Sequence, residues 1–285
     1  MRFSRPALAL LLATAAGVVA GCGGGSHQVA APRDKNPAHV ARAVRSAPTT
    51  TTIPATTVPP TTAPPTTVPP TTAPPTTVAP GVSVPASTTV AVLKGDTPGS
   101  ATPGGPVVQT VPGTWYGVVS SLPVINESPG WLDVRLAQRP NESTAWIPAS
   151  DATLQTTLDA IVVNLTTRHL ELYVKGKLTD DFPVGIGEPW TPTPPGTFFV
   201  AQIDSPPDAG YGPFVMVTSA HSDAITDWEG SGDAIIAIHG PITAEADAEI
   251  GTTGAQVSNG CIRLHDADLA QLGNVPVGSP VDIVA

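Results

Sequence analysis

Basic residues are scarce in this chain of 285 residues, which contains 13 Lys and Arg against 23 Asp and Glu and has a formal charge of −10. A protein surface that binds nucleic acid needs clustered Lys and Arg side chains to neutralise phosphates. The composition therefore argues against nucleic acid as a partner.

The apolar run near the N-terminus is too short to cross a bilayer. It covers residues 7–20, whereas a spanning helix needs about 20 apolar residues. Basic residues before the run and small residues after it are typical of a secretory signal, which we place at residues 1–21. The sequence Val-Ala-Gly-Cys at 19–22 resembles the lipobox of bacterial lipoproteins. That resemblance implies cleavage before Cys22 and a diacylglycerol thioether on its sulfur.

We therefore expect an extracytoplasmic protein that is anchored by lipid to the bacterial membrane and faces the cell wall. Residues 23–46 carry a net charge of +3, which would attract anionic lipid headgroups. The alternative to lipidation is ordinary secretion, with Cys22 free or in a disulfide. The alternative role of residues 23–46 is that of an ordinary solvated tail.

Proline is concentrated in the first half of the chain, which excludes one compact domain of 285 residues. Sixteen of the 34 prolines lie between residues 48 and 112, and residues 56–80 contain five copies of a five-residue Thr/Pro-rich unit. Each proline fixes its backbone φ angle and removes a hydrogen-bond donor, which favours an extended polyproline II chain. We interpret residues 22–106 as a lipidated N-terminus and a disordered Pro/Thr-rich linker. The composition also fits an O-glycosylated stalk.

Residues 107–151 show strand and hairpin signals. Short apolar runs alternate with turn residues and lack helical periodicity. The sequence of residues 130–148 resembles the end of bacterial SH3-like modules, which implies a small β module that binds wall peptides. A packing or spacer role is the alternative.

Residues 152–285 are expected to form a second, mainly β domain. Strands are predicted at 160–164, 170–174, 178–187, 197–203, 214–217, 234–238 and 281–284. One short helix is predicted with Asp266 as N-cap, 267–272 as its body and Gly273 at its end.

Cys261 and His239 are the candidate catalytic residues. A lone cysteine in an oxidising compartment is either buried and inert or kept for its reactivity. Gly260 precedes this thiol, and the amides of Gly260 and Cys261 could point at a substrate oxyanion. His239 ends an apolar strand at 234–238 and is followed by Gly240. A thiol with an imidazole is the minimum for nucleophilic acyl transfer. No second Cys or His lies at zinc spacing, so we expect no metal.

These motifs resemble the L,D-transpeptidase (YkuD) catalytic domain of bacterial cell walls. The family has Ile-His-Gly at a strand end and Ser/Thr-His-Gly-Cys before an apolar residue and Arg or Asn. This chain has Ile-His-Gly at 238–240 and Ser-Asn-Gly-Cys-Ile-Arg at 258–263. Further similarity at 161–173, 182–187 and 191–198 extends the resemblance over residues 158–285. It implies a β-sandwich catalytic domain in residues 152–285.

The resemblance also implies residue roles and partners. Cys261 would attack the carbonyl of the third residue of a peptidoglycan stem and release the terminal D-alanine, with His239 as acid/base. Gly260 and Gly240 would serve as oxyanion and orienting residues, and Ser258, Asn259 and Arg263 would shape the substrate pocket. The thioester would pass to an amine of another stem and cross-link the wall. The family uses no cofactor and is typically acylated by carbapenems.

Two departures from the family pattern leave questions open. Asn259 stands where many members have a second His, and the loop from His239 to Cys261 is long. Its acidic part, residues 244–250, is either a solvated helix face or a segment that gates the site or attracts amines.

The acceptor of the acyl group could also be water, as in an L,D-carboxypeptidase, or a protein amine, as in an anchoring enzyme. A wall-binding scaffold without catalysis is the remaining alternative.

Overall fold

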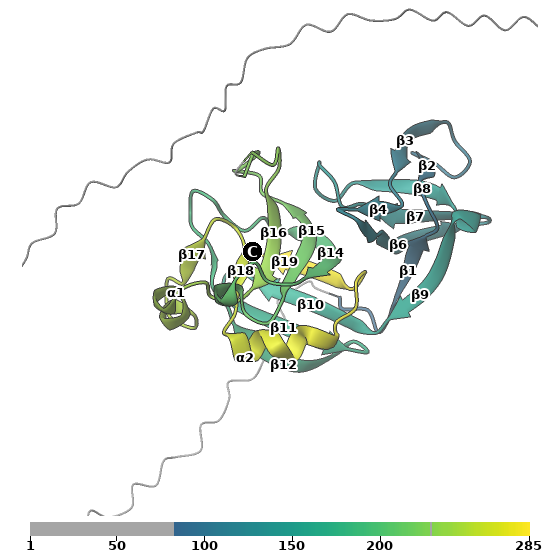
Figure 1. The fold of residues 1–285 in the computed structure, drawn as a ribbon. Coiled ribbons are helices and arrows are strands. Elements are labelled where there is room, and N and C mark those ends of the chain that lie inside the picture. Colours follow the sequence, from purple (N-terminus) through teal and green to yellow (C-terminus); the bar gives the residue numbers. More distant parts are fainter. Residues whose placement is uncertain (1–82, 229) are drawn as a thin grey trace, which may run out of the picture. The chain divides into compact units, whose positions relative to one another are not determined.

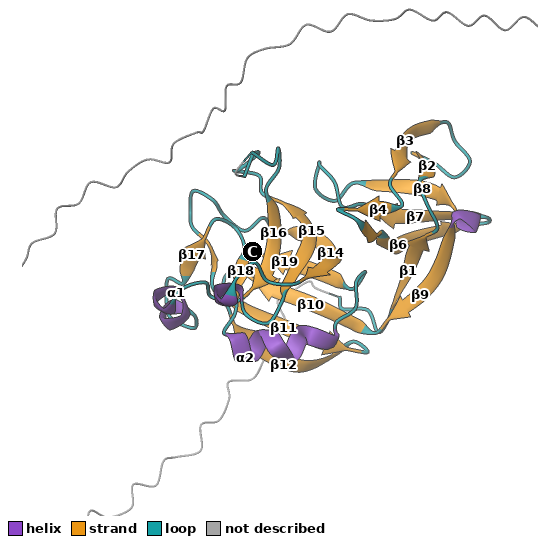
Figure 2. Ribbon diagram, in the orientation of Figure 1, coloured by secondary structure: helices purple, strands orange, loops and turns teal. Residues whose placement is uncertain are grey.

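The computed structural model describes residues 83–228 and 230–285, which lie within one compact unit of the chain. The expected signal peptide at 1–21, Cys22 and the linker up to residue 82 lie outside the described residues. The described part is mainly β, as predicted, with two short α-helices (Figures 1 and 2).

No helix in the described ranges is both long and apolar enough to cross a membrane.

The first sheet is antiparallel and has seven strands, in the order β3-β2-β8-β7-β6-β1-β9 (Figure 1). A separate two-stranded hairpin, β4–β5, accompanies it. The strands are β1 (Thr88–Leu93), β2 (Thr97–Ser100), β3 (Val107–Val111), β4 (Thr114–Trp115), β5 (Val118–Val119), β6 (Ser121–Ser128), β7 (Trp131–Arg135), β8 (Thr144–Pro148) and β9 (Ala152–Thr157), with a 3-10 turn at Ala149–Asp151.

Two predicted boundaries of this module were wrong. The linker was expected to extend to residue 106, but β1 and β2 lie before that position and belong to the sheet. The module was expected to end at residue 151, but β9 pairs along its whole length with β1. The β-branched sequence Thr-Thr-Val-Ala-Val-Leu at 88–93 is typical of a strand, but because prolines lie near it, it was assigned to the linker. Pairing between β1 and β9 is distant in sequence and leaves no local pattern.

The second sheet has eight strands, in the order β12-β11-β10-β19-β14-β15-β16-β18 (Figure 1). Its strands are β10 (Asp159–Asn164), β11 (His169–Val174), β12 (Lys177–Pro183), β14 (Gly196–Asp204), β15 (Val215–His221), β16 (Ile235–His239), β18 (Ile262–Arg263) and β19 (Pro280–Val284). A short parallel pair, β13 (Ile186–Gly187) and β17 (Gln256–Ser258), lies outside it. The 3-10 turns here are Ala209–Tyr211 and Leu272–Asn274.

Two short helices complete the second module. The predicted helix is present as α2 (Asp266–Gln271), although His265 and not Asp266 is its N-cap residue. The acidic segment forms α1 (Ala244–Glu249), whose N-cap Thr243 accepts a hydrogen bond from the Ala246 amide at 3.2 Å. Glu245 and Glu249 face solvent while Ala246 is buried. This is the solvated helix face that was one of the two expectations for residues 244–250.

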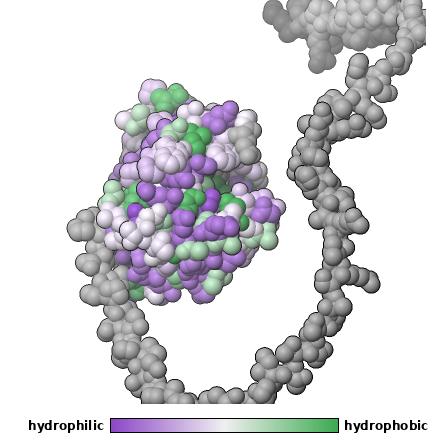
Figure 3. Space-filling model, turned by 90° about the vertical axis from the view of Figure 1, so that its left-hand side faces the viewer, coloured by the Kyte–Doolittle hydropathy of each residue, from purple (hydrophilic) through white to green (hydrophobic). Residues whose placement is uncertain are grey.

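Strand β14 belongs to both hydrophobic cores. Successive side chains of a strand point to opposite faces. Phe198 and Val200 accordingly pack in the core of the second sheet, whereas Phe199 and Ala201 pack in the core of the first. Most atoms on the face drawn in Figure 3 are hydrophilic, and its apolar patches are small and separate. Phe199 and Ala201 are 1% and 7% exposed, so the apolar contact of β14 with the first core is internal.

We predict that Phe199→Ala destabilises both sheets together. The side chain is 1% exposed, and truncation of a buried Phe costs about 3–5 kcal/mol. Chemical denaturation, followed by far-UV and near-UV circular dichroism, should show a single unfolding transition with a lower denaturant midpoint than in the wild type. Val107→Ala, at a side chain that is 63% exposed, should change the free energy of unfolding by less than about 0.5 kcal/mol. Two separate transitions in Phe199→Ala would contradict a shared core.

Candidate active site

Two neighbouring parallel strands bring His239 and Cys261 together. Strand β18 pairs with β16, and Ile262 lies opposite Ile238 while Arg263 lies opposite His239. Cys261 immediately precedes β18, and His239 is the last residue of β16. The Leu264 amide donates to the His239 carbonyl at 3.0 Å. Two residues that are 22 positions apart in sequence therefore sit at the same edge of the sheet.

Both side chains line one cavity of about 390 Å³. Ser258, Asn259 and Arg263 line it as well, so the five predicted catalytic and pocket residues lie together. The remaining wall comes from Tyr211 and Ile242, from β16, from the loop between β15 and β16, and from Tyr116 of the first module.

The His239 imidazole is held in one tautomer. Its Nδ1 lies 2.7 Å from the Gly240 carbonyl oxygen, and because a carbonyl can only accept, Nδ1 carries the proton. Nε2 is then unprotonated and can accept one. The Tyr211 ring packs against the imidazole, with ring centroids 4.8 Å apart. The predicted orienting role of the Gly240 carbonyl agrees with this geometry.

Burial keeps the imidazole neutral. The residue is 2% exposed, and desolvation lowers the pKa of His239 to about 4, helped by the positive charge of Arg263 and opposed by the hydrogen bond with Gly240. At neutral pH this group is therefore a base ready to take a proton.

A hydrogen-bonded turn fixes the backbone at Cys261. The Ser258 hydroxyl donates to the Cys261 carbonyl at 2.6 Å and accepts from the Gly260 amide at 3.1 Å. The Thr193 hydroxyl donates to the Gly260 carbonyl at 2.8 Å. Gly260 has a φ of +119°, and a Cβ there would lie 2.8 Å from the Ile236 side chain. Glycine is therefore required for both the backbone angle and the close approach.

The turn changes one expectation about the oxyanion donors. We expected the amides of both Gly260 and Cys261 to face the substrate, but the Gly260 amide is occupied by Ser258 Oγ. Ser258 is thus a residue that shapes the nucleophile turn as well as lining the cavity. The Cys261 amide stays the predicted oxyanion donor.

The Cys261 thiol is half-buried and forms no disulfide with any residue that the structure describes. Burial raises the pKa of Cys261, while a backbone hydrogen bond from Ala237 and the charge of Arg263 act in the opposite direction. With His239 deprotonated and Cys261 protonated, the resting pair is a neutral thiol and a neutral imidazole. Proton transfer then has to accompany attack on a substrate.

Arg263 and Asn259 complete the cavity floor. One guanidinium nitrogen of Arg263 donates to the Pro241 carbonyl at 3.3 Å, while its Nε is buried without a hydrogen-bond partner in the described residues. The Asn259 side-chain oxygen accepts from the Thr191 hydroxyl at 3.3 Å. Within residues 83–228 and 230–285, no three His, Cys, Asp or Glu side chains are grouped to hold a metal ion.

Sequence reasoning missed several residues of the site. Thr193 lies in a loop and Tyr211 ends a 3-10 turn, and their contacts with Gly260 and His239 cross 67 and 28 positions of the chain. Asp233 is a further residue of the cavity wall, and it is hydrogen-bonded to the buried His221. None of these long-range contacts leaves a periodic signal in the sequence.

Part of the chain matches one known family model. Residues 159–283 match the model of the L,D-transpeptidase catalytic domain, YkuD. The YkuD proteins of Bacillus licheniformis and Bacillus subtilis are 29% and 27% identical to this chain over 124 residues, which are 43% of this chain and 64% of each relative. The chain thus spans less than two thirds of the length of these curated relatives.

Among solved structures, the catalytic domain of an Enterococcus faecium L,D-transpeptidase acylated by ertapenem is 26% identical, with a TM-score of 0.32. The match covers 44% of this chain and 95% of that one.

The charge state of the pair predicts the pH dependence of thiol reactivity. In a Cys22→Ser background, the rate of Cys261 alkylation by iodoacetamide should still rise above about pH 8.5, the ordinary thiol pKa, because burial raises the thiol pKa. Intact-mass kinetics between pH 5 and 10 would measure this. A rate that is independent of pH between 5 and 8 would instead indicate a thiolate–imidazolium pair and contradict the neutral one.

Proposed function

We propose that the chain is an L,D-transpeptidase that cross-links peptidoglycan through a Cys261 thioester, and the match of residues 159–283 to the catalytic domain model of that family supports this. The observation that supports this most is the cavity shared by Cys261 and His239, in which His239 is neutral and held by Gly240. A scaffold without catalysis would not need a base with a free Nε2 beside an unpaired thiol.

The acylation step follows from these positions. The Cys261 thiol gives its proton to His239 Nε2 while its sulfur attacks the carbonyl carbon of the third stem residue. The developing oxyanion accepts a hydrogen bond from the Cys261 amide. His239 then returns the proton to the departing nitrogen, the carbon–nitrogen bond breaks, and D-alanine leaves. A thioester on Cys261 remains.

The second step reverses the proton transfers. An amine of another stem attacks the thioester carbonyl and gives its proton to His239. The carbon–sulfur bond breaks, the thiol regains the proton, and a new amide joins the two stems. Residues 151–285 contain 18 acidic and 4 basic residues, a negative field that favours a cationic amine as the acceptor. If water takes the acyl group instead, the protein is an L,D-carboxypeptidase. If a protein amine takes it, the protein is an anchoring enzyme.

We propose in addition that the enzyme works outside the cytoplasm on a lipid anchor at Cys22. The lipobox-like sequence at 19–22, the short apolar run before it and the Pro/Thr-rich segment after it support this. Such a segment would let the catalytic domain reach the wall from the membrane.

We predict that purified protein releases D-alanine from a disaccharide-tetrapeptide and forms cross-linked dimers. Cys261→Ala should abolish both products, and His239→Gln should lower the rate at least about 100-fold because the general acid–base is lost. Mass spectrometry of the muropeptides measures all three outcomes. A meropenem adduct of one equivalent, absent in Cys261→Ala, is also expected.

The product type separates the alternatives. Shortened stems without dimers would indicate carboxypeptidase activity, and a protein–peptide conjugate would indicate anchoring. Retention of peptidoglycan without any turnover would contradict the proposed enzyme and support a wall-binding scaffold.

The proposed lipid anchor predicts that mutation of Cys22 moves the protein from the membrane fraction to the soluble fraction. Wild-type protein expressed in a bacterium should incorporate labelled palmitate and sediment with membranes, because acyl chains bury in the bilayer. Cys22→Ser should lose the label and appear in the soluble fraction. Equal labelling of both proteins would rule out Cys22 as the lipidation site.

A further inference from the structure

One wall of the cysteine cavity is a loop that connects β15 to β16. This loop, residues 222–234, provides Ser222, Ile225, Trp228, Ser231, Asp233 and Ala234 to the cavity. Trp228 is 45% exposed, and residues 222–228 and 230–234 form no helix or strand. Hydrogen bonds within the loop, such as that from the Trp228 amide to the Asp233 carbonyl at 2.9 Å, shape it, and contacts from outside the loop hold its ends.

Those contacts come from the first sheet. The loop between β7 and β8 carries Arg139, whose guanidinium donates to Asp233 Oδ1 at 2.8 Å, to the Ser222 carbonyl at 2.8 Å and to the Ile225 carbonyl at 3.1 Å. Asn141, two residues later, exchanges two hydrogen bonds with the backbone of His221, at 2.8 and 2.9 Å. Arg139 thus joins both ends of the cavity loop and one residue inside it.

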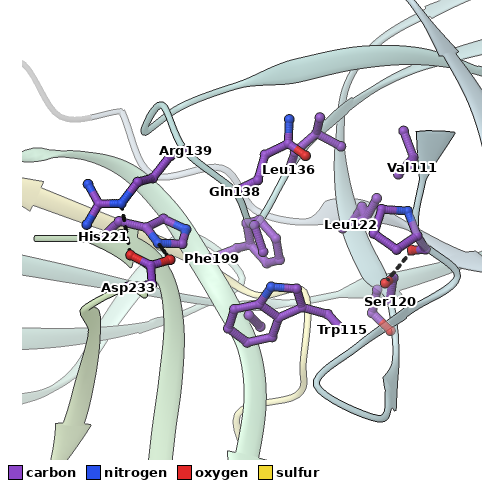
Figure 4. A pocket seen from close by; sticks show the side chains of 14 residues that line it. Val111, Trp115, Ser120, Leu122, Leu136, Gln138, Arg139, Phe199, His221 and Asp233 are labelled. Atoms are coloured by element: carbon purple, nitrogen blue, oxygen red, sulfur yellow. Dashed lines mark hydrogen bonds and ion pairs between the residues drawn. The ribbon is translucent and has the colours of Figure 1, made fainter. Parts of the chain in front are cut away.

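Asp233 is the centre of this arrangement (Figure 4). Its Oδ1 accepts from Arg139 and from the Ala234 amide at 2.7 Å, and its Oδ2 accepts from His221 Nδ1 at 2.7 Å. Burial opposes ionisation, but the hydrogen bonds from Ala234 and Arg139 and the nearby charges hold the pKa of Asp233 below its usual value. The carboxylate is therefore charged, and its bond with Arg139 is a charge-assisted one.

The first module also reaches the cavity directly. Tyr116 lies at the turn of the β4–β5 hairpin, lines the same cavity and is 66% exposed. The preceding Trp115 packs against the core of the first sheet and meets the Tyr116 ring edge-on, with centroids 4.7 Å apart. Tyr116 and Gly117 have φ angles of 45° and 85°, as the two central residues of a type I′ hairpin turn require, so the turn fixes the direction of the Tyr116 side chain.

We propose that the first sheet is part of the substrate-binding site, with Tyr116 as a contact for the peptide stem and Arg139 as a positioning residue for the cavity loop. This inference rests on the proposed function. The catalytic pair is held by β16 and β18, so loss of Arg139 should loosen stem binding and leave the reactivity of the thiol unchanged. A loss of that kind raises KM more than it lowers kcat.

The first test compares Arg139→Ala, Arg139→Lys and the control Lys94→Ala. Lys94 is an exposed basic residue of the same module whose ammonium bonds only within it, to the Ser150 carbonyl. Arg139→Ala should raise amide hydrogen exchange across 222–234 and raise the KM for the disaccharide-tetrapeptide about tenfold, since hydrogen bonds to charged groups are lost. Arg139→Lys should restore little of the wild-type exchange or KM, because Lys lacks the planar guanidinium that donates to three acceptors. Iodoacetamide should alkylate Cys261 at the wild-type rate or faster in every variant.

The second test uses Tyr116, whose exposure allows substitution without loss of the fold. Tyr116→Ala should raise KM about two- to tenfold through the lost aromatic contact, and Tyr116→Phe should restore it. Val119→Ala, on the same hairpin and outside the cavity, serves as control.

The outcomes separate this inference from the proposed function. Unchanged exchange at 222–234 and unchanged KM in Arg139→Ala, with active wild-type enzyme, would overturn the inference alone. Wild-type protein that never acts on the stem would overturn the proposed function, and with it the stem-binding role, whether or not exchange changes. A fall in both kcat and the alkylation rate in Arg139→Ala would show a general loss of structure and would also count against a positioning role.

Discussion

The parallel pairing of β16 with β18 is the contact on which the site depends. It places Arg263 opposite His239 and brings Cys261 to the end of the strand that carries the imidazole. Strand β18 has only two residues, so its position also relies on the turn before it, where Ser258 and Thr193 bond the Cys261 and Gly260 carbonyls. Gly260 is fixed by its positive φ and by Ile236. A short strand, a tight turn and one glycine thus position Cys261.

Burial then sets the chemistry of the pair. The same desolvation that lowers the pKa of His239 raises that of Cys261, so both effects favour neutral partners over an ion pair. The charge of Arg263 acts differently on the two groups, because it disfavours an imidazolium and favours a thiolate. The half-buried guanidinium of Arg263 would therefore stabilise a thiolate at Cys261.

The two modules depend on each other for stability and for the shape of the cavity. Alternation along β14 gives each core two side chains of the same strand, and the Thr157 and Ser279 hydroxyls form a buried hydrogen bond between β9 and the residue before β19. The contacts of Arg139 and Asn141 with the cavity loop lie in this joined region. A module that could have served only as a spacer is thus built into the structure around Cys261.

The sequence by itself determined the mainly β fold, most strands of the second sheet, helix α2 and the residues at the site, because alternating apolar residues, turn residues and a Gly before a lone Cys are local signals. It misplaced the start and end of the first module, since β1 pairs with β9 across about sixty residues and pairing at that distance has no local signature. It gave no role to Arg139, Asp233 or Tyr116, and it did not predict that the Gly260 amide donates to the Ser258 hydroxyl. Only the tertiary structure decided these, because burial and hydrogen-bond partners depend on chain segments that meet in space and not in sequence.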